Sequence, residues 1–345
     1  MEVAFILEKL ILVVIIFVIT LVIAMYSTLA ERKIAGFMQD RYGPDRAGIF
    51  GLLQPLCDGG KFFFKEEIIP AGAHKTLFVI GPVIAIITAC ISSAVIPWGQ
   101  NLTIGDQVIT LQVADVNIGV LYIFGVIALG VYGIMLGGWA SNNKFSLMGA
   151  IRAASQSISY EIPMGLSLIA LLMVTGNLSI GDIVANQSGF NWNIWVQPLG
   201  FLIFIVCAFA ECNRVPFDLP ECETELVGGY HTEYSSMKLG LYMFSEYINM
   251  FVSSALMAAL YFGGYNFPFM YDLGLSENWI TIIGTLVFFL KIFGFIFFFM
   301  WIRWTLPRFR YDQLMNLGWK MLIPLAIANI VLTGIITIVV DTYFK

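Results

Sequence analysis

The sequence predicts an all-α, polytopic membrane protein with eight transmembrane helices and one amphipathic helix at the membrane interface. Of its 345 residues, 59% are hydrophobic and only 12% are charged, whereas an ordinary soluble domain has roughly 25% charged residues. Apolar runs long enough to cross a hydrocarbon core of about 30 Å recur along the whole chain. The charged residues fall mainly between these runs, so we treat residues 1–345 as a single membrane domain.

Eight apolar runs are expected to form the transmembrane helices, since a helix needs about 20 residues to cross the core. They lie near residues 4–29, 77–97, 118–139, 154–175, 196–210, 239–262, 280–302 and 321–341. The first is longer than a span needs, which predicts a tilted helix. Its acidic residues Glu2 and Glu8 argue against a signal peptide. The fifth is short, so we expect its helix to continue into the acidic stretch that follows.

The distribution of basic residues predicts the orientation of the chain. Every loop lysine and arginine lies between spans one and two, three and four, five and six, or seven and eight, and the other three connections have none. The positive-inside rule therefore places these four loops in the cytoplasm and both termini outside. The cytoplasmic loops cover about residues 31–76, 140–153, 211–238 and 303–320.

The first cytoplasmic loop contains the predicted amphipathic helix. In FGLLQPLCDGGKFFFKEEIIP, residues 50–70, polar side chains recur at helical spacing on one stripe, and leucine and phenylalanine cover the opposite side. The polar stripe consists of Gln54, Asp58, Lys61 and Lys65. Such a helix lies in the plane of the membrane interface. It is either a plain connector or one wall of an opening for a lipid-like molecule, and the spacing leaves both possibilities open.

Three ionisable residues fall within the expected spans. Glu161 lies near the start of the fourth span, Glu246 one to two turns into the sixth, and Lys291 near the middle of the seventh. Charge at membrane depth is costly, so we expect these groups to face a protein interior or a water-filled cavity. The alternative for each is a structural role as a hydrogen-bond anchor between helices.

The stretch AECNRVPFDLPECETELVGGY, residues 210–230, gathers carboxylates around a single basic residue, Arg214. Burial and neighbouring negative charge both raise the pKa of a carboxyl group, so closely placed acids titrate as a coupled set. A solvated acidic loop is the alternative, but interleaved apolar and aromatic residues favour a packed surface. We therefore expect one group of acids to store and pass protons. Its members are Glu161, Glu211, Glu221, Glu223, Glu225, Glu233 and Glu246.

Several chemistries find no support in the sequence. His74 and His231 lie on different loops, so a bis-histidine haem has no ligand pair. The five cysteines form no C-x-x-C pair and occupy cytoplasmic or buried positions, so we expect no iron–sulfur cluster, metal site or disulfide. Dinucleotide-binding and P-loop signatures are missing. If electrons are involved, their carrier must belong to a partner.

Four long motifs in the cytoplasmic loops closely resemble the H-subunit family of bacterial NADH:quinone oxidoreductase, respiratory complex I, the counterpart of mitochondrial complex I subunit 1. They are ERKIAGFMQDRYGPDRAGIFGLLQPLCDGGKFFFKE (31–66), GWASNNKFSLMGAIRAASQSISYE (138–161), AECNRVPFDLPECETELVGGYHTEYSSMKLGLYMFSEYINM (210–250) and WIRWTLPRFRYDQLMNLGWK (301–320). The resemblance covers all four loops in order. Departures are small: Cys222 stands where Ala or Gly is more usual, and Cys57 lies in the interfacial helix.

The resemblance implies a multi-pass subunit of the bacterial inner membrane, with periplasmic termini, that couples quinone reduction to proton translocation. The implied residues of the quinone tunnel or subunit docking are Glu31, Arg32, Asp58, Lys61, Arg214, Phe217, Asp218 and Glu233. Those of the proton path are Glu161, Glu211, Glu221, Glu223, Glu225 and Glu246. Quinone is the implied substrate, and this chain holds no cofactor of its own.

The implied partners are the hydrophilic-arm subunits, which carry the flavin and the iron–sulfur clusters including the terminal one, and adjacent antiporter-like membrane subunits. The bilayer surrounds the chain, and no nucleic acid is involved. Three other classes stay open on the residues alone: a self-sufficient cation/proton antiporter, the membrane anchor of a related hydrogenase, and a structural scaffold. The patterned cytoplasmic loops and the number of expected buried acids favour the oxidoreductase subunit.

Overall fold

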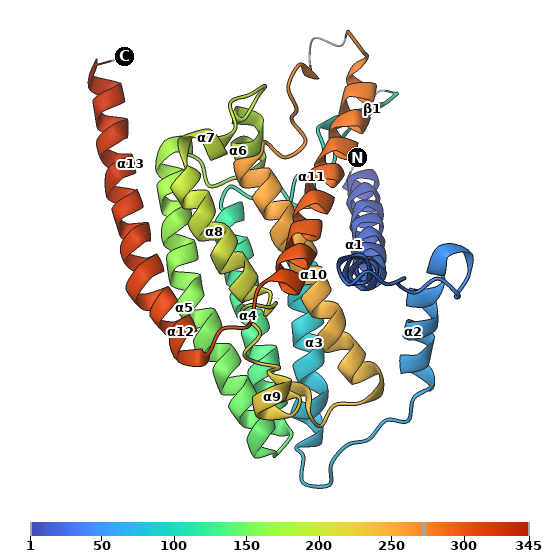
Figure 1. The fold of residues 1–345 in the computed structure, drawn as a ribbon. Helices are drawn as coiled ribbons and strands as arrows, with labels where there is room; N and C mark the ends of the chain where they lie inside the picture. The colour runs from blue at the N-terminus through green and yellow to red at the C-terminus, as the bar shows by residue number, and fades with distance from the viewer. Residues whose placement is uncertain (1, 106, 271–273, 344–345) are drawn as a thin grey trace.

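Helices packed side by side make up most of the molecule (Figure 1). The computed structural model describes residues 2–105, 107–270 and 274–343. The α-helices are α1 (Glu2–Met38), α2 (Gln54–Phe64), α3 (Lys75–Ser92), α4 (Gly119–Ala140), α5 (Lys144–Thr175), α6 (Ile180–Asn186), α7 (Asn193–Val196), α8 (Pro198–Glu211), α9 (Glu223–Leu226), α10 (Ser236–Tyr261), α11 (Glu277–Thr305), α12 (Tyr311–Asn316) and α13 (Ile323–Tyr343). The 3₁₀ turns are η1 (Ile49–Gly51), η2 (Ser93–Val95) and η3 (Gly229–His231), η5 (Leu317–Leu322) is a π-helical segment, and the strands are β1 (Asn101–Ile104) and β2 (Gln107–Thr110).

Seven helical segments of the described chain are long and apolar enough to cross a membrane. They are Ile6–Met38, Lys75–Val95, Gly119–Ala140, Lys144–Thr175, Ser236–Tyr261, Glu277–Thr305 and Tyr311–Tyr343. This result confirms an all-α, polytopic membrane protein, and these segments correspond to seven of the eight expected spans. The remaining one corresponds to α8, which is apolar but has only 14 residues, about 21 Å of helix. Its role as an eighth span stays a prediction.

The end of α8 differs from the expectation that this helix continues into the acidic stretch. The helix ends at Glu211, and the Cys212 backbone N–H still bonds the carbonyl of Ala208. The next residue, Asn213, has a φ of 50°, a left-handed conformation that breaks a right-handed helix. Pro216 and Pro220, which lack a backbone donor, then prevent the helix from restarting in this segment.

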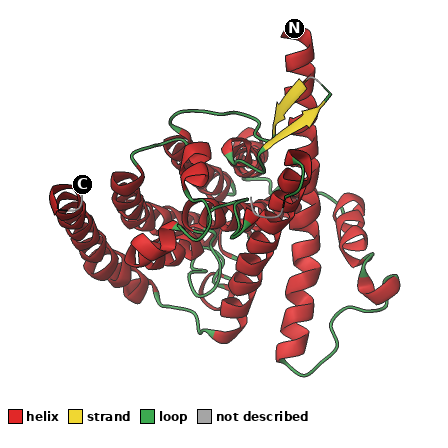
Figure 2. Cartoon of the chain, turned by 90° about the horizontal axis from the view of Figure 1, so that it is seen from above, coloured by secondary structure: helices red, strands yellow, loops and turns green. Residues whose placement is uncertain are grey.

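Helix α10 is the central element of the bundle, and α1 crosses it from one side. Within the most apolar stretch of α10, 72% of the residues are buried, against 17% in the segment that contains α13. Ser253, Ser254 and Ala255 lie in this stretch, and small residues of this kind allow close approach of neighbouring helices. Helix α1 is foreshortened in Figure 1 but extends lengthwise in Figure 2, so it is steeply inclined to the helices behind it.

Helix α2 lies within the segment predicted to be amphipathic but is shorter than that segment. It ends at Phe64, and Lys65 has extended backbone, so residues 66–70 continue without helical structure. The hydroxyl of Ser236 donates to the carbonyls of Phe62, at 3.0 Å, and Lys65, at 2.9 Å. These bonds satisfy carbonyls at the helix end and hold α2 against the start of α10. Its location at a membrane interface stays a prediction.

The antiparallel hairpin formed by β1 and β2 is an element that the sequence pattern does not predict. Its register pairs Asn101 with Thr110 and Ile104 with Gln107. The side-chain amide of Asn278 donates to the carbonyl of Thr103 at 2.7 Å, and its oxygen accepts from the Thr103 backbone N–H at 2.9 Å. The hairpin therefore connects the loop after α3 to the beginning of α11.

Candidate functional site

A buried ion cluster forms where the C-terminal end of α1, the loop after α8, α10 and the C-terminal end of α11 meet. Its centre is Glu31, whose Oε2 accepts from Arg214 Nη1 at 3.2 Å and from the Tyr247 hydroxyl at 2.7 Å. The other carboxylate oxygen pairs with Arg303. The guanidinium of Arg214 also lies 4.1 Å from the centre of the Tyr247 ring, a cation–π contact. Four segments distant in sequence thus share one group of charges.

Arg214 belongs to the acidic loop, which we define as residues 211–233. Burial disfavours the charged guanidinium, but the negative groups around it, including Tyr247, Glu31 and Glu246, hold the pKa of Arg214 above its ordinary value. Its Nε and Nη2 atoms are buried without a hydrogen-bond partner among the described residues. Because a guanidinium has five N–H donors, one carboxylate cannot use them all. Unpaired buried donors of this kind indicate a place where water or a ligand enters.

Asp218 is the second focus of the acidic loop. Its Oδ2 accepts from Arg308 Nη2 at 2.6 Å, while its Oδ1 is buried and has no partner among the described residues. Burial raises the pKa of Asp218 to about 7, and Glu221 adds to this shift, while Arg308 and Arg303 oppose it. The effect of burial therefore outweighs that of the ion pair, and Asp218 exchanges its proton near neutral pH.

Glu221 and Glu246 continue the network towards α10. The two carboxyl groups interact with each other, and Glu246 also interacts with Asp218. The hydroxyl of Tyr230 donates to Glu246 Oε1 at 3.1 Å, and His231 Nδ1 lies 3.7 Å from Glu221 Oε1. Burial raises the pKa of Tyr230 well above its usual range, so this phenol stays a hydrogen-bond donor.

Glu161 and Glu211 form a separate carboxylate pair across α5 and α8. Their charges interact with each other. One oxygen of Glu211 is buried without a partner among the described residues, whereas Glu161 opens into a groove of about 650 Å³ between α4 and α5. The pair thus connects the interior beside the acidic loop with the outer surface of the bundle.

Gln156 holds the acidic loop against α5. Its buried amide donates to the carbonyls of Ala210 and Phe217, each at 2.7 Å, and to Asn213 Oδ1 at 3.2 Å. The ring of Phe217 lies 5.3 Å from that of Tyr160, centre to centre, at an edge-on angle. These contacts give the loop a defined shape, as the interleaved apolar residues predicted.

The other predicted site residues lie at the edge of this network. Glu223 and Glu225 are exposed, and Glu225 pairs with Arg152 of α5 at 2.6 Å. Glu233 accepts from the amide of Asn143 at 2.6 Å. Arg32 and Asp58 connect α1 to α2 at 2.7 Å, and the exposed Lys61 is 3.8 Å from Asp58. The predicted set therefore divides into an inner, buried group and an outer group of more exposed pairs.

Lys291 does not join the carboxylates. Its ammonium donates to the carbonyls of Phe262, Gly264 and Asn266, at 2.7, 2.8 and 2.6 Å. Gly263 and Gly264 have φ values of 73° and 52°, which turn the chain just after α10. All three donors of the ammonium are used, so Lys291 is a hydrogen-bond anchor between α10 and α11.

Sequence reasoning missed Arg303, Arg308 and Tyr247 as parts of the site. The two arginines served only as markers of orientation, although they follow a long apolar helix at the level where Glu31 and Asp218 need cations. Tyr247 is adjacent to the predicted Glu246, and its role depends on α1 crossing α10. A search for arginines at the ends of spans would have found the first two.

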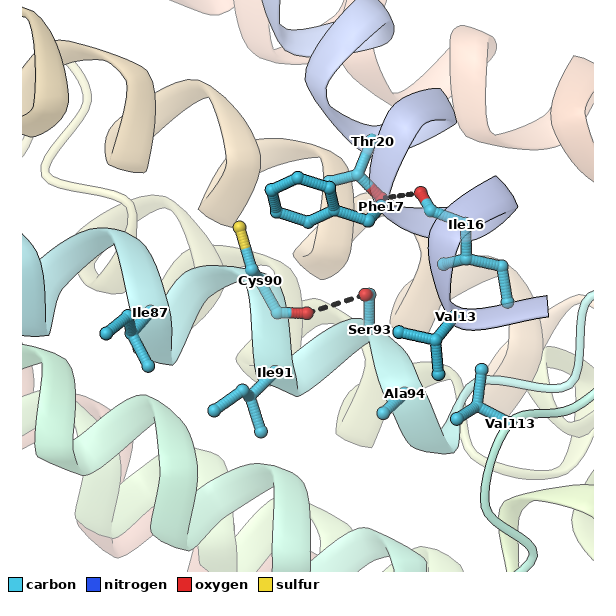
Figure 3. Close-up of a pocket in the computed structure, with 10 residues that line it drawn as sticks. All are labelled: Val13, Ile16, Phe17, Thr20, Ile87, Cys90, Ile91, Ser93, Ala94 and Val113. Atoms are coloured by element: carbon cyan, nitrogen blue, oxygen red, sulfur yellow. Dashed lines mark hydrogen bonds between the residues drawn. The ribbon is translucent and has the colours of Figure 1, made fainter. Parts of the chain in front are cut away.

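Metal ligands do not gather in the described ranges, where no group of three or more His, Cys, Asp or Glu side chains is arranged to hold a metal ion. All five cysteines are free thiols. An apolar cavity of about 300 Å³ lies between α1 and α3 (Figure 3). Its hydroxyls are already used, because Thr20 donates to Ile16 at 2.8 Å and Ser93 to Cys90 at 2.7 Å. This cavity offers space for hydrocarbon but no acid or base.

Together, the membrane-length helices and the buried, incompletely paired charges define an integral membrane protein that handles charge in apolar surroundings. The family model described as NADH dehydrogenase matches residues 10–334, and the chain belongs to this family.

Similar curated proteins are all H subunits of NADH-quinone oxidoreductase. The first of two such subunits numbered in Cytophaga hutchinsonii is 70% identical, over 96% of this chain and 97% of its own. The H subunit of Flavobacterium psychrophilum is 63% identical, over 97% and 98%. The one numbered 2 in Geobacter metallireducens is 48% identical, over 94% of both chains. The resemblance seen in the loop motifs is thereby confirmed over nearly the whole length.

Proposed function

We propose that this chain forms much of the quinone-binding tunnel of a proton-translocating NADH:quinone oxidoreductase, together with the start of its carboxylate proton path. Quinone is the substrate of the complex, and the flavin and iron–sulfur clusters reside in partner subunits. The isolated chain has no catalytic activity of its own. Its family membership and the names of its relatives support the setting. The buried charge network supports the role.

The observation that carries the proposal is the set of buried polar atoms without partners around the acidic loop. Arg214 offers two free nitrogens, and Asp218 and Glu211 each offer a free oxygen. Desolvated polar groups are costly unless something pairs with them. Water and a polar ligand head are suitable partners, and a tunnel passing between α1, α2 and the acidic loop would supply both.

The carboxylates are placed to respond to the redox state of the quinone. Reduction of the quinone adds negative charge, which raises the proton affinity of acids nearby. Asp218, Glu221 and Glu246 interact with one another, and Glu211 interacts with Glu161. In the proposed mechanism, reduction or movement of the quinone reorders the acidic loop and changes these affinities. The pair Glu161 and Glu211 transmits the change to adjacent antiporter-like subunits, a linkage between two sites.

A substitution at Glu211 tests this path. Glutamine keeps the size of the side chain but cannot release a proton, so Glu211→Gln in the intact complex should lower both quinone reduction and proton uptake by about tenfold or more. Both are measured in sealed membrane vesicles supplied with NADH. Glu277→Gln is the matched control, because Glu277 is an exposed residue at the first turn of α11, far from the network. Normal reduction with normal proton uptake in Glu211→Gln would refute the path.

The proposed setting is the bacterial inner membrane, with both termini periplasmic and the hydrophilic arm docked on the four loops that the charge pattern predicts to be cytoplasmic. Purification in mild detergent tests this setting. Flavin and iron–sulfur subunits should co-purify with the chain. If the chain instead purified alone and exchanged cations for protons in vesicles, it would be an independent antiporter.

A further inference from the structure

Arg308 has no role in the function proposed above, yet it is one of two arginines that hold the buried carboxylates. It belongs to the α11–α12 linker, residues 306–310. We propose that Arg308 is a positioning residue that holds the Asp218 carboxylate in place and binds the linker to the acidic loop, so that both segments move as one unit. The inference rests on the proposed function, because it concerns the regulation of the same acidic loop.

The contacts of the linker are directed to one part of the acidic loop. Arg308 Nη2 donates to Asp218 Oδ2 at 2.6 Å, and its Nη1 donates to the Cys222 thiol at 3.5 Å. One guanidinium therefore spans two turns of the loop. The neighbouring Phe309 donates its backbone N–H to the carbonyl of Pro216 at 3.1 Å.

A ring contact reinforces this attachment. The rings of Phe309 and Phe217 lie 5.4 Å apart, centre to centre. Phe217 in turn contacts Tyr160 of α5. The linker is thus joined to the loop by an ion pair, a thiol contact, a backbone bond and an aromatic pair, and the ion pair is the only one of these that a proton can break.

The charges facing Asp218 make its pairing with Arg308 sensitive to protonation. Glu221 of the loop and Glu246 of α10 act on it as like charges, and Arg303 at the end of α11 acts as a second cation. Arg303 is already paired with Glu31. Arg308 is therefore the cation dedicated to Asp218, and protonation of Asp218 would release the linker while leaving the Glu31 cluster paired.

The first test is the pH dependence of NADH:quinone reductase activity in membranes that contain the whole complex. Burial raises the pKa of Asp218 to about 7 despite Arg308, and removal of the nearby cation should raise it further, by about one pH unit or more. The part of the pH profile due to Asp218 should therefore move to higher pH in Arg308→Ala and less in Arg308→Lys. It should vanish in Asp218→Asn and in the double variant Arg308→Ala/Asp218→Asn.

A second measurement does not depend on turnover. Cys222 is buried, whereas Cys57 is exposed, so maleimide labelling of the purified complex, quantified by mass spectrometry, compares both thiols in one sample. Labelling of Cys222 should become several-fold faster in Arg308→Ala, with Cys57 unchanged and Arg308→Lys in between. Co-purification of partner subunits confirms assembly, and Arg308→Lys carries the test should Arg308→Ala fail to assemble.

Three outcomes would overturn the inference: an unshifted pH profile in Arg308→Ala, or in Arg308→Lys if only that variant assembles; a shift that persists when Asp218 is also replaced; or unchanged labelling of Cys222. Failure of the proposed function looks different. In that case the wild-type complex itself would lack quinone reductase activity, while the labelling of Cys222 would still report whether Arg308 holds the loop.

Discussion

Lys291 and Arg214 are both cations enclosed by the bundle, and the protein treats them in opposite ways. Lys291 donates to three backbone carbonyls and has no donor left over. Arg214 contacts Glu31 through one nitrogen, while two of its other nitrogens are buried and unpaired among the described residues. The first cation is a finished structural joint. The second leaves polar atoms available in a place where they are costly.

The difference separates structural from functional charge more clearly than depth in the membrane does. From the sequence, Lys291 is the most conspicuous charge, since it lies in the middle of an apolar helix. Its partners, however, are fixed backbone carbonyls that cannot change protonation. The partners of Arg214 and Asp218 are carboxylates and a phenol, which can. A charge network that can gain or lose protons is suited to coupling, whereas a saturated anchor is suited to stability.

Removal of Arg214 should have the largest effect. Arg214→Ala leaves the buried Glu31 with one cation fewer and removes the cation–π contact with Tyr247. Breaking a buried ion pair from one side costs about 3–5 kcal/mol, so we expect a distorted acidic loop and a severe loss of quinone reductase activity or of assembly. Activity in membranes and the amount of chain that co-purifies with its partners measure both. If both stayed intact, Arg214 would have no more than a local role.

Lys291→Met should have an intermediate effect and of a different kind. The substitution leaves three carbonyls without their donor, at about 1–3 kcal/mol for an unsatisfied buried group, so the thermal midpoint of the detergent-solubilised complex should fall. The pH dependence of quinone reduction should stay as in the wild type, because no titrating partner is lost. A displaced pH profile in Lys291→Met would contradict the division into anchor and network.

The sequence was sufficient for one half of this comparison and insufficient for the other. Apolar length predicted the long helices, because crossing a bilayer imposes a strong constraint that each segment satisfies by itself. Composition also placed Arg214 and its acidic neighbours together. The pairing of Glu31 with Arg303, and of Asp218 with Arg308, depends on how α1 and α11 approach the acidic loop, and that approach is a property of the whole bundle.

Local breaks in the helices were also difficult to predict. The end of α8 at Glu211 follows from a left-handed Asn213, a conformation that Asn adopts more readily than most residues but does not require. The hairpin near Thr103 has short strands, and its contacts with Asn278 come from a segment distant in sequence. Neither feature produces a strong periodic pattern.

The smallest effect among the predicted proton-path residues is expected at Glu225. Its pair with Arg152 is partly exposed, with 47% of the glutamate side chain and 21% of the arginine side chain accessible, and such pairs are worth roughly 1 kcal/mol or less. Glu225→Gln should therefore reduce proton uptake far less than Glu211→Gln, with little change in stability. Vesicle assays on both variants at equal complex content make the comparison. Equal losses at the two positions would mean that exposure does not separate the inner from the outer carboxylates, and the path would have to reach the surface at α9.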